Sequence, residues 1–196
     1  AARWSRALGK PDAAMEAKAN ALQEFIQREL WNAKTGFFYD RWSVKEPEHF
    51  AFEGIWLVVV GAATAEQAKR VIEEHLLNPR EFFAPHPIST VAMNDSKFAP
   101  RMWRGPAWNC MTYWAARGCV RYGHKDAARK LLEAALDATG IIFERTGTLW
   151  EFYDPQLGDQ KALHRKSKGR PIPCEDYIGH NPLFAMADLW RRCQPR

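Results

Sequence analysis

A single carboxylate among aromatic side chains is the most informative chemical feature of this sequence. Glu151 lies in the stretch TGTLWEFYDPQLGD, between Trp150 and Phe152 and close to Tyr153. A carboxylate that packs against aromatic rings is poorly solvated, and packing alone does not offset that cost. Glu151 is therefore a candidate functional residue, because perturbed acidic groups gather at functional sites.

A second cluster, RMWRGPAWN, combines two Trp and two Arg at residues 101–109, just before or at the start of a predicted helix. The first turn of a helix presents unpaired N–H groups and a partial positive charge. Sugar hydroxyls and carboxylates pair well with such groups and with Arg, while Trp faces stack on pyranose rings. The alternative is that Trp108 and Trp114 are core residues. We expect that role for Trp114, and not for Trp103, which precedes the helix.

The apolar periodicity of most segments predicts helices. Residues 52–63 are apolar nearly all round and are interpreted as a buried inner helix. Thr64 and Gln67 have the spacing of a capping box. Pro106 suits a first helical position, and Asn181 suits an N-cap. The predicted helices span residues 11–32, 52–63, 65–77, 106–123, 125–139 and 180–193.

The connections between these helices carry further signals. Gly36 falls where the C-terminal turn of the first helix is expected. Residues 78–105 form a long Pro-rich and aromatic connection, and connections of that length are usually functional. No strand ladder is predicted. An apolar helix is twice followed by an amphipathic one, which is the pattern of helical hairpins stacked around an axis.

Composition indicates one globular domain over residues 1–196, with 46% hydrophobic residues and a net charge of +5. Part of the charge lies in HRKSKGRP, residues 164–171, where a phosphate or nucleic-acid site is the alternative to a solvated loop. We expect the loop, because aromatic residues are absent from the cluster. No nucleic acid, membrane, metal or cofactor is expected as a partner.

The four Cys residues form no metal-ligand pair such as CxxC. Cys110 and Cys119 are expected on one helix, roughly 13 Å apart along its axis, which is too far for a disulfide. Free thiols favour a reducing compartment, hence the cytoplasm.

The two motifs together resemble a known family. MWRGPAWNCMTYWAARGCVRYG, followed by TLWEFYDPQLG, is similar to the C-terminal half of (α/α)6-barrel glycoside hydrolases, in particular glycoside hydrolase family 63, with the trehalases of family 37 as relatives. LWNAKTGFFYDRW and the segment 63–98 are similar to the same family in the same order. The resemblance implies an all-α fold of helical hairpins that forms about half of a barrel.

The resemblance also implies a mechanism. It makes Glu151 the general base that activates water in an inverting hydrolysis of an α-glucoside or α-mannoside. Such an enzyme needs a second carboxylic acid about 6.5–9.5 Å away to protonate the leaving group. The candidate substrate-binding residues are Trp103, Arg104, Gly105, Trp108, Trp150 and Tyr153.

The general acid of the family has no match in this chain. Asp40 and Asp95 lie in matched loops, but the family does not use those positions as acids. The chain also opens without Met, as a processed or excised piece does. Three functions follow: an inverting glycosidase or its C-terminal part, a non-catalytic carbohydrate-binding remnant, and a helical scaffold. An oligosaccharide or small glycoside is the expected ligand, and a homodimer or an N-terminal half-barrel the expected assembly.

Overall fold

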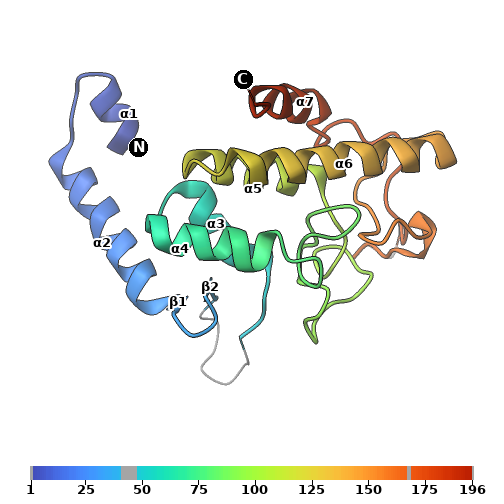
Figure 1. The fold of residues 1–196 in the computed structure, drawn as a ribbon, viewed down its shortest axis with the longest axis horizontal. Coiled ribbons are helices and arrows are strands. Elements are labelled where there is room, and N and C mark those ends of the chain that lie inside the picture. Colours follow the sequence, from blue (N-terminus) through green and yellow to red (C-terminus); the bar gives the residue numbers. More distant parts are fainter. Residues whose placement is uncertain (1, 41–47, 167–168, 196) are drawn as a thin grey trace.

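The structure is a computed structural model that describes residues 2–40, 48–166 and 169–195 (Figure 1). Arg41 and Trp42 of one motif, and Ser167 and Lys168 of the basic cluster, lie outside the described residues. The elements are α1 (Ala2–Ala7), α2 (Ala13–Glu29), β1 (Trp31–Asn32), β2 (Phe37–Phe38), α3 (Phe52–Val60), α4 (Ala65–Arg70), the π-helical η1 (Val71–Leu76), α5 (Asn109–Arg121), α6 (Lys125–Thr146), the 3-10 helix η2 (Gln160–Ala162) and α7 (Leu183–Arg192).

The first helical hairpin, α3 and α4, is confirmed. Gly61 ends α3 in the left-handed conformation at φ 80°, which glycine adopts without a Cβ penalty. The capping box forms as predicted: Gln67 N–H donates to Thr64 Oγ1 at 3.2 Å, and Thr64 N–H donates to Gln67 Oε1 at 2.8 Å. The helix direction therefore reverses within a few residues.

The second hairpin, α5 and α6, differs from the prediction at its start. Helix α5 begins at Asn109 with Trp108 as N-cap, so Pro106 is not its first residue. The reason is that Ala107 pairs with Tyr153: each N–H donates to the carbonyl of the other at 2.9 Å. Extended pairing at residue 107 excludes helical dihedral angles there.

Helix α6 is longer than predicted, since it continues through Gly140 to Thr146. A glycine inside a helix costs about 1 kcal/mol relative to alanine. Ile142 is fully buried in the next turn and anchors the extension. The helix ends at Gly147, whose φ of 73° is left-handed.

Two further corrections to the predicted helix ends concern loop residues. Gly36, at φ 71°, does not end α2; it turns a hairpin in which Trp31 pairs with Phe38. Asn181 does not cap α7, whose N-cap is Pro182. Instead, the Asn181 side chain accepts a hydrogen bond from Asn109 Nδ2 at 2.6 Å and so links the approach to α7 with the start of α5.

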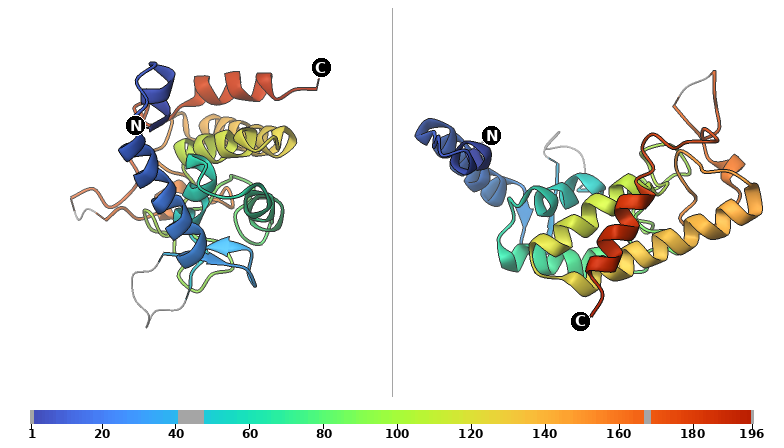
Figure 2. Two further views of the ribbon diagram at one scale, coloured as in Figure 1. Left: turned by 90° about the vertical axis from the view of Figure 1, so that its left-hand side faces the viewer. Right: turned by 90° about the horizontal axis from the view of Figure 1, so that it is seen from above.

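The helices pack side by side in a row, and the core lies between them. Helices α3 and α5 pack together, α5 packs on α6, and α6 packs on α7 (Figures 1 and 2). Cys119 is fully buried in α5, and Cys110 lies on the same helix, as expected. All four cysteines are free.

Short and long connections separate to opposite ends of the helices (Figure 1). The turns 61–64 and 122–124 lie at one end, and the loops 77–108, 147–166 and 169–182 lie at the other. Four isolated bridges tie the long loops side by side: Ala51 with Val91, Ser89 with Ala107, Ala107 with Tyr153 and Arg101 with His164. The RMWRGPAWN and LWEFYDP motifs therefore meet at this end.

Two glycines provide a test of the packing. A Cβ on Gly54 would collide with the Phe38 carbonyl and lie 2.5 Å from the Phe37 ring, whereas a Cβ on Gly140 meets nothing within 4 Å. Gly54→Ala should lower the free energy of unfolding by about 1–3 kcal/mol through overpacking. Gly140→Ala should raise it by about 0.5–1 kcal/mol. Urea unfolding of both variants measures the difference, and equal effects would contradict the close approach of α3 to β2.

Candidate functional site

The Glu151 carboxylate is buried and paired. Its side chain is 4% exposed, and Arg165 Nε lies 2.9 Å from its Oε2. Arg165 Nη2 donates to Oε1 at 3.2 Å, and the Cys174 N–H donates to Oε2 at 3.2 Å. The Nε contact is an ion pair whose N–H is not aimed well enough at the oxygen to count as a hydrogen bond. Arg165 therefore belongs to the site, and the expectation that the basic cluster is only a solvated loop is wrong for this residue.

The backbone around Glu151 is fixed from two sides. Its N–H donates to the Cys174 carbonyl at 2.9 Å. Trp150 and Tyr153 are each 1% exposed and form a small core with Ile142. The Tyr153 hydroxyl accepts from Trp150 N–H at 3.2 Å and from Asn181 Nδ2 at 3.1 Å. The two rings lie in the interior, and they hold the Glu151 backbone in place.

Trp103 and Trp108 form an aromatic stack beside this core. Their ring centroids lie 4.2 Å apart at an interplanar angle of 7°. Trp108 is buried and also lies against the tilted ring of Phe152, with centroids 5.2 Å apart, whereas Trp103 is 40% exposed. One face of the Trp103 ring stacks on Trp108, and part of the side chain remains exposed to solvent. The Trp108 indole N–H has no hydrogen-bond partner within the described residues.

Trp103 adopts an unusual backbone conformation, with φ at 64°. A bulky residue in this region costs about 1–3 kcal/mol, and such strain concentrates at functional sites. The segment is held by its neighbours: Met102 N–H donates to the His164 carbonyl at 2.7 Å, and His164 N–H donates to the Pro100 carbonyl at 2.9 Å. This pairing places Trp103 next to the segment that supplies Arg165.

Arg104 and Gly105 are neighbours in the chain but lie in different environments. Arg104 is exposed, and its guanidinium has no hydrogen-bond or ion-pair partner within the described residues. Gly105 is buried, and both its backbone groups bond to Thr90: Gly105 N–H donates to Thr90 Oγ1 at 3.0 Å, and the carbonyl accepts Thr90 N–H at 3.2 Å. A Cβ at Gly105 would lie 2.5 Å from the Ala99 carbonyl, so glycine is required here for packing. Its backbone groups are therefore not available to a ligand.

Asp95, one of the two loop carboxylates, is fully engaged. Its Oδ1 lies 2.9 Å from His49 Nδ1 and accepts Lys97 N–H, and its Oδ2 accepts Phe50 N–H. Its contacts are those of a loop-stabilising group. Across the described ranges, no cluster of His, Cys, Asp and Glu has the arrangement of a metal site, and no described helix is long and apolar enough to cross a membrane.

Sequence reasoning missed Arg165, Asn181 and His86 as parts of the site. His86 is fully buried and stacks on Tyr153 with centroids 4.5 Å apart. Its Nδ1 donates to the Pro87 carbonyl at 3.2 Å, and its Nε2 contacts Thr139 Oγ1. The signal available for Arg165 was only its place in a basic cluster, and nothing marked the other two.

The comparisons with known proteins agree with the motif pair. The mannosylglycerate hydrolase MGH1-like glycoside hydrolase domain matches residues 1–175. The chain belongs to this family. The mannosylglycerate hydrolase of Rubrobacter radiotolerans is 26% identical over 163 residues, covering 80% of this chain and 36% of that protein. The cytosolic neutral trehalase of Kluyveromyces lactis is 28% identical over 167 residues, covering 75% and 22%.

Solved structures show the same fold. The family 63 mannosylglycerate hydrolase from Thermus thermophilus, in complex with Tris and D-glycerate, superimposes with a TM-score of 0.67 at 22% identity, covering 96% of this chain and 41% of that one. The neutral trehalase from Saccharomyces cerevisiae gives 0.68 at 19% identity, covering 95% and 31%. The expectation of helical hairpins from an (α/α)6 barrel is confirmed, and the chain spans less than half the length of these relatives.

The ion pair at Glu151 gives a direct prediction. Arg165→Gln leaves a buried carboxylate without its cation, and breaking a buried pair costs about 3–5 kcal/mol. Because the Arg165 side chain keeps 21% exposure, we expect the lower end of that range. Glu151→Gln combined with Arg165→Gln should recover part of the loss in a double-mutant cycle measured by urea unfolding. Additive effects would mean that the two groups do not interact.

His86 gives a second prediction. Burial lowers the pKa of His86 to about 4 from the ordinary 6.5. Below pH 6.5 His86 therefore binds a proton in the unfolded chain but stays neutral in the folded chain. The free energy of unfolding falls as the pH drops towards about 4, by roughly 3 kcal/mol in total. His86→Phe keeps a ring on Tyr153 and should remove this part of the pH dependence. His164→Phe, at an exposed position, should leave it unchanged.

Proposed function

We propose that this chain carries the general-base side of an inverting glycoside hydrolase site, with Glu151 as the base. One observation supports it above others: the Glu151 carboxylate is buried yet held in a fixed orientation by Arg165 and the Cys174 N–H. An ionised carboxylate offers about four acceptor positions. Two N–H groups donate to it, those of Arg165 Nη2 and Cys174, so acceptor positions remain for a water, which would be aligned for attack on an anomeric carbon.

The exposed face of Trp103 is the proposed sugar platform. Its ring is fixed by the stack on Trp108, so a pyranose that binds there loses little ring mobility on the protein side. Arg104 is the residue after Trp103, and its side chain has no partner in the described part of the chain. Its guanidinium is therefore available to hydroxyl or carboxylate oxygens of a ligand. We assign Trp108, Trp150 and Tyr153 to the support of this platform and of the base, because each is buried.

We propose a small α-glycoside as the substrate. The relative from Rubrobacter radiotolerans is a mannosylglycerate hydrolase, and the one from Kluyveromyces lactis is a trehalase. The substrates of these two relatives differ in charge, because mannosylglycerate carries a carboxylate and trehalose is neutral. Arg101 and Arg104 are exposed next to Trp103 and lack a carboxylate partner among the described residues. We therefore propose a glycoside whose aglycone carries a carboxylate in preference to a neutral disaccharide.

Binding without turnover is the second candidate function for the chain by itself. Inversion requires a proton donor across the sugar from the base. Asp95 is occupied by loop contacts, and no other carboxylate matches the acid of the family. The 196 residues should therefore bind the glycoside, and hydrolysis should need a carboxylic acid supplied by further polypeptide.

Titration calorimetry and a rate measurement together test this function. Mannosylglycerate should bind the chain more tightly than trehalose, and Trp103→Ala should weaken binding. Trp4→Ala, at a ring that is 73% exposed on α1, is the control and should bind normally. Glu151→Gln should keep binding but, in a form that turns over substrate, should lower the rate about 10²–10⁴-fold. Normal turnover by Glu151→Gln would refute the base, and normal binding by Trp103→Ala would refute the platform.

A further inference from the structure

Two segments of the long loops are basic and contain no acid. Neither residues 96–125 nor residues 160–174 include an Asp or a Glu. Both segments reach into the long-loop end of the molecule (Figure 1). The described basic residues that they place in these loops are Lys97, Arg101, Arg104, Lys161, His164, Arg165, Lys166 and Arg170.

Backbone hydrogen bonds hold the two segments side by side. Met102 N–H donates to the His164 carbonyl at 2.7 Å, and His164 N–H donates to the Pro100 carbonyl at 2.9 Å. Arg101 and His164 are thereby partners in a parallel bridge. Bridge partners lie on the same face of the pair, and both of these residues are exposed. The adjacent Met102 and Leu163 lie on the inner side, in the small core around Trp108.

The exposed basic residues of the paired segments form one surface, which we call the basic strip. It consists of Arg101, Arg104, Lys161, His164 and Lys166. Their side chains have no hydrogen-bond or ion-pair partner within the described residues. The acids that flank the two segments bond to the backbone: Asp95 accepts the Lys97 and Phe50 N–H groups, and Asp159 accepts the Lys161 N–H at 2.9 Å. The strip therefore carries positive charge that these acids do not neutralise.

A solvated loop does not account for the whole of this arrangement. Like charges that lie next to one another repel, yet the bridge places Arg101 beside His164. The second segment is also closed on itself, because Arg165 N–H donates to the Pro171 carbonyl at 2.6 Å. The backbone thus fixes the positive charges near one another before any partner binds. A negative partner that fits them loses little protein freedom on binding.

The basic strip begins at the proposed sugar platform. Trp103 lies between Arg101 and Arg104 in the chain, and its ring is 40% exposed. A single carboxylate is satisfied by one bidentate Arg. The strip offers two Arg side chains and continues along the second segment to Lys166. A ligand that pairs with the whole strip must therefore carry several negative charges and extend beyond Trp103.

We propose that the basic strip binds an acidic oligosaccharide, in which carboxylate-bearing sugar units follow the unit on Trp103. This inference rests on the proposed function for the sugar on Trp103 and extends it to the units beyond. Exposed ion pairs are individually weak, so the affinity comes from several pairs at once and falls with salt. A nucleic acid fits less well, because its bases stack on successive aromatic rings, and Trp103 is the exposed aromatic side chain in the described parts of residues 96–104 and 160–174.

Two matched probes test the proposal by titration calorimetry. One is a tetramer of galacturonate, and the other is the same tetramer with every carboxylate methyl-esterified. At low salt the acid tetramer should bind at least about tenfold more tightly, and added salt should remove most of the difference. Equal affinity for the two probes would overturn the proposal. Tighter binding of a single-stranded DNA with the same number of charges would overturn it as well, because the partner would then be a phosphate polymer.

A pair of Lys variants locates the contact. Lys161→Gln with Lys166→Gln should weaken binding of the acid tetramer at least about fivefold and leave the methyl ester unchanged. Both side chains are exposed and unpaired within the described residues, so the fold is retained. Lys69→Gln with Lys130→Gln makes the same charge change on exposed positions of α4 and α6 and should bind the acid tetramer normally. An equal loss in this control would refute the strip, because net charge alone would then explain the binding.

Trp103→Ala separates this inference from the proposed function. It should weaken both tetramers, because the sugar unit on its ring is common to them. If Trp103→Ala weakens both probes and the Lys161 and Lys166 pair weakens neither, the platform is supported and the strip is refuted. If the Lys pair weakens the acid tetramer and Trp103→Ala changes neither affinity, the strip is supported as an anion-binding surface and the platform is refuted.

Discussion

The pairing of Glu151 with Arg165 and the Cys174 N–H is the interaction on which the long-loop end of the molecule depends. A carboxylate that is only 4% exposed is very costly unless donors surround it. Two later segments of the chain return to Glu151 and supply these donors. The basic segment brings Arg165, and the segment around residue 174 brings the Cys174 backbone. Those returns also bring His164 beside Met102, and so fix the strained Trp103 on top of Trp108. The proposed base and the proposed platform are thus positioned by one network.

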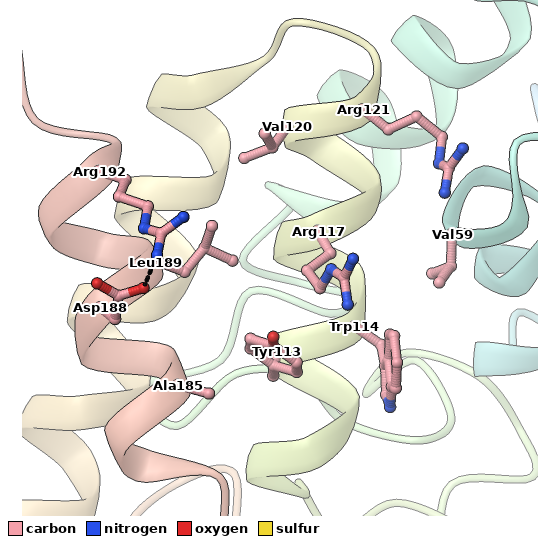
Figure 3. Close-up of a pocket in the computed structure, with 10 residues that line it drawn as sticks. All are labelled: Val59, Tyr113, Trp114, Arg117, Val120, Arg121, Ala185, Asp188, Leu189 and Arg192. Atoms are coloured by element: carbon pink, nitrogen blue, oxygen red, sulfur yellow. Dashed lines mark ion pairs between the residues drawn. The ribbon is translucent and has the colours of Figure 1, made fainter. Parts of the chain in front are cut away.

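The helices supply the frame for this network. Tight turns after α3 and α5 leave the other ends of the hairpins to long loops, and the Ala107–Tyr153 bridge joins two of those loops at the middle of the site. The same bridge shortens α5, because residue 107 is extended rather than helical. A groove between α5 and α7 reaches the end of α3 (Figure 3), and its lining includes Tyr113 and Trp114 together with Arg117 and Arg121, which have no carboxylate partner among the described residues.

The sequence predicted the parts that local chemistry determines. Periodicity located α2 to α7 but not α1, and Thr64 with Gln67 specified the start of α4. Long-range pairing was beyond its reach. Pro106 is a good first helical residue, but the partner strand at Tyr153 overrides that preference. Trp114 has the spacing of a core residue, but its face meets a groove and not the core. Arg165 could be identified only by its contact with a carboxylate fourteen residues earlier in the chain.

A crystal structure of the chain grown with D-glucose tests the central claim most directly, which is that Trp103 and Glu151 form one sugar site. A pyranose ring should stack on the open face of Trp103, and a water bonded to the Glu151 carboxylate should face its anomeric carbon. Glucose bound elsewhere, or a Glu151 carboxylate with no path to the sugar on Trp103, would contradict the assignment.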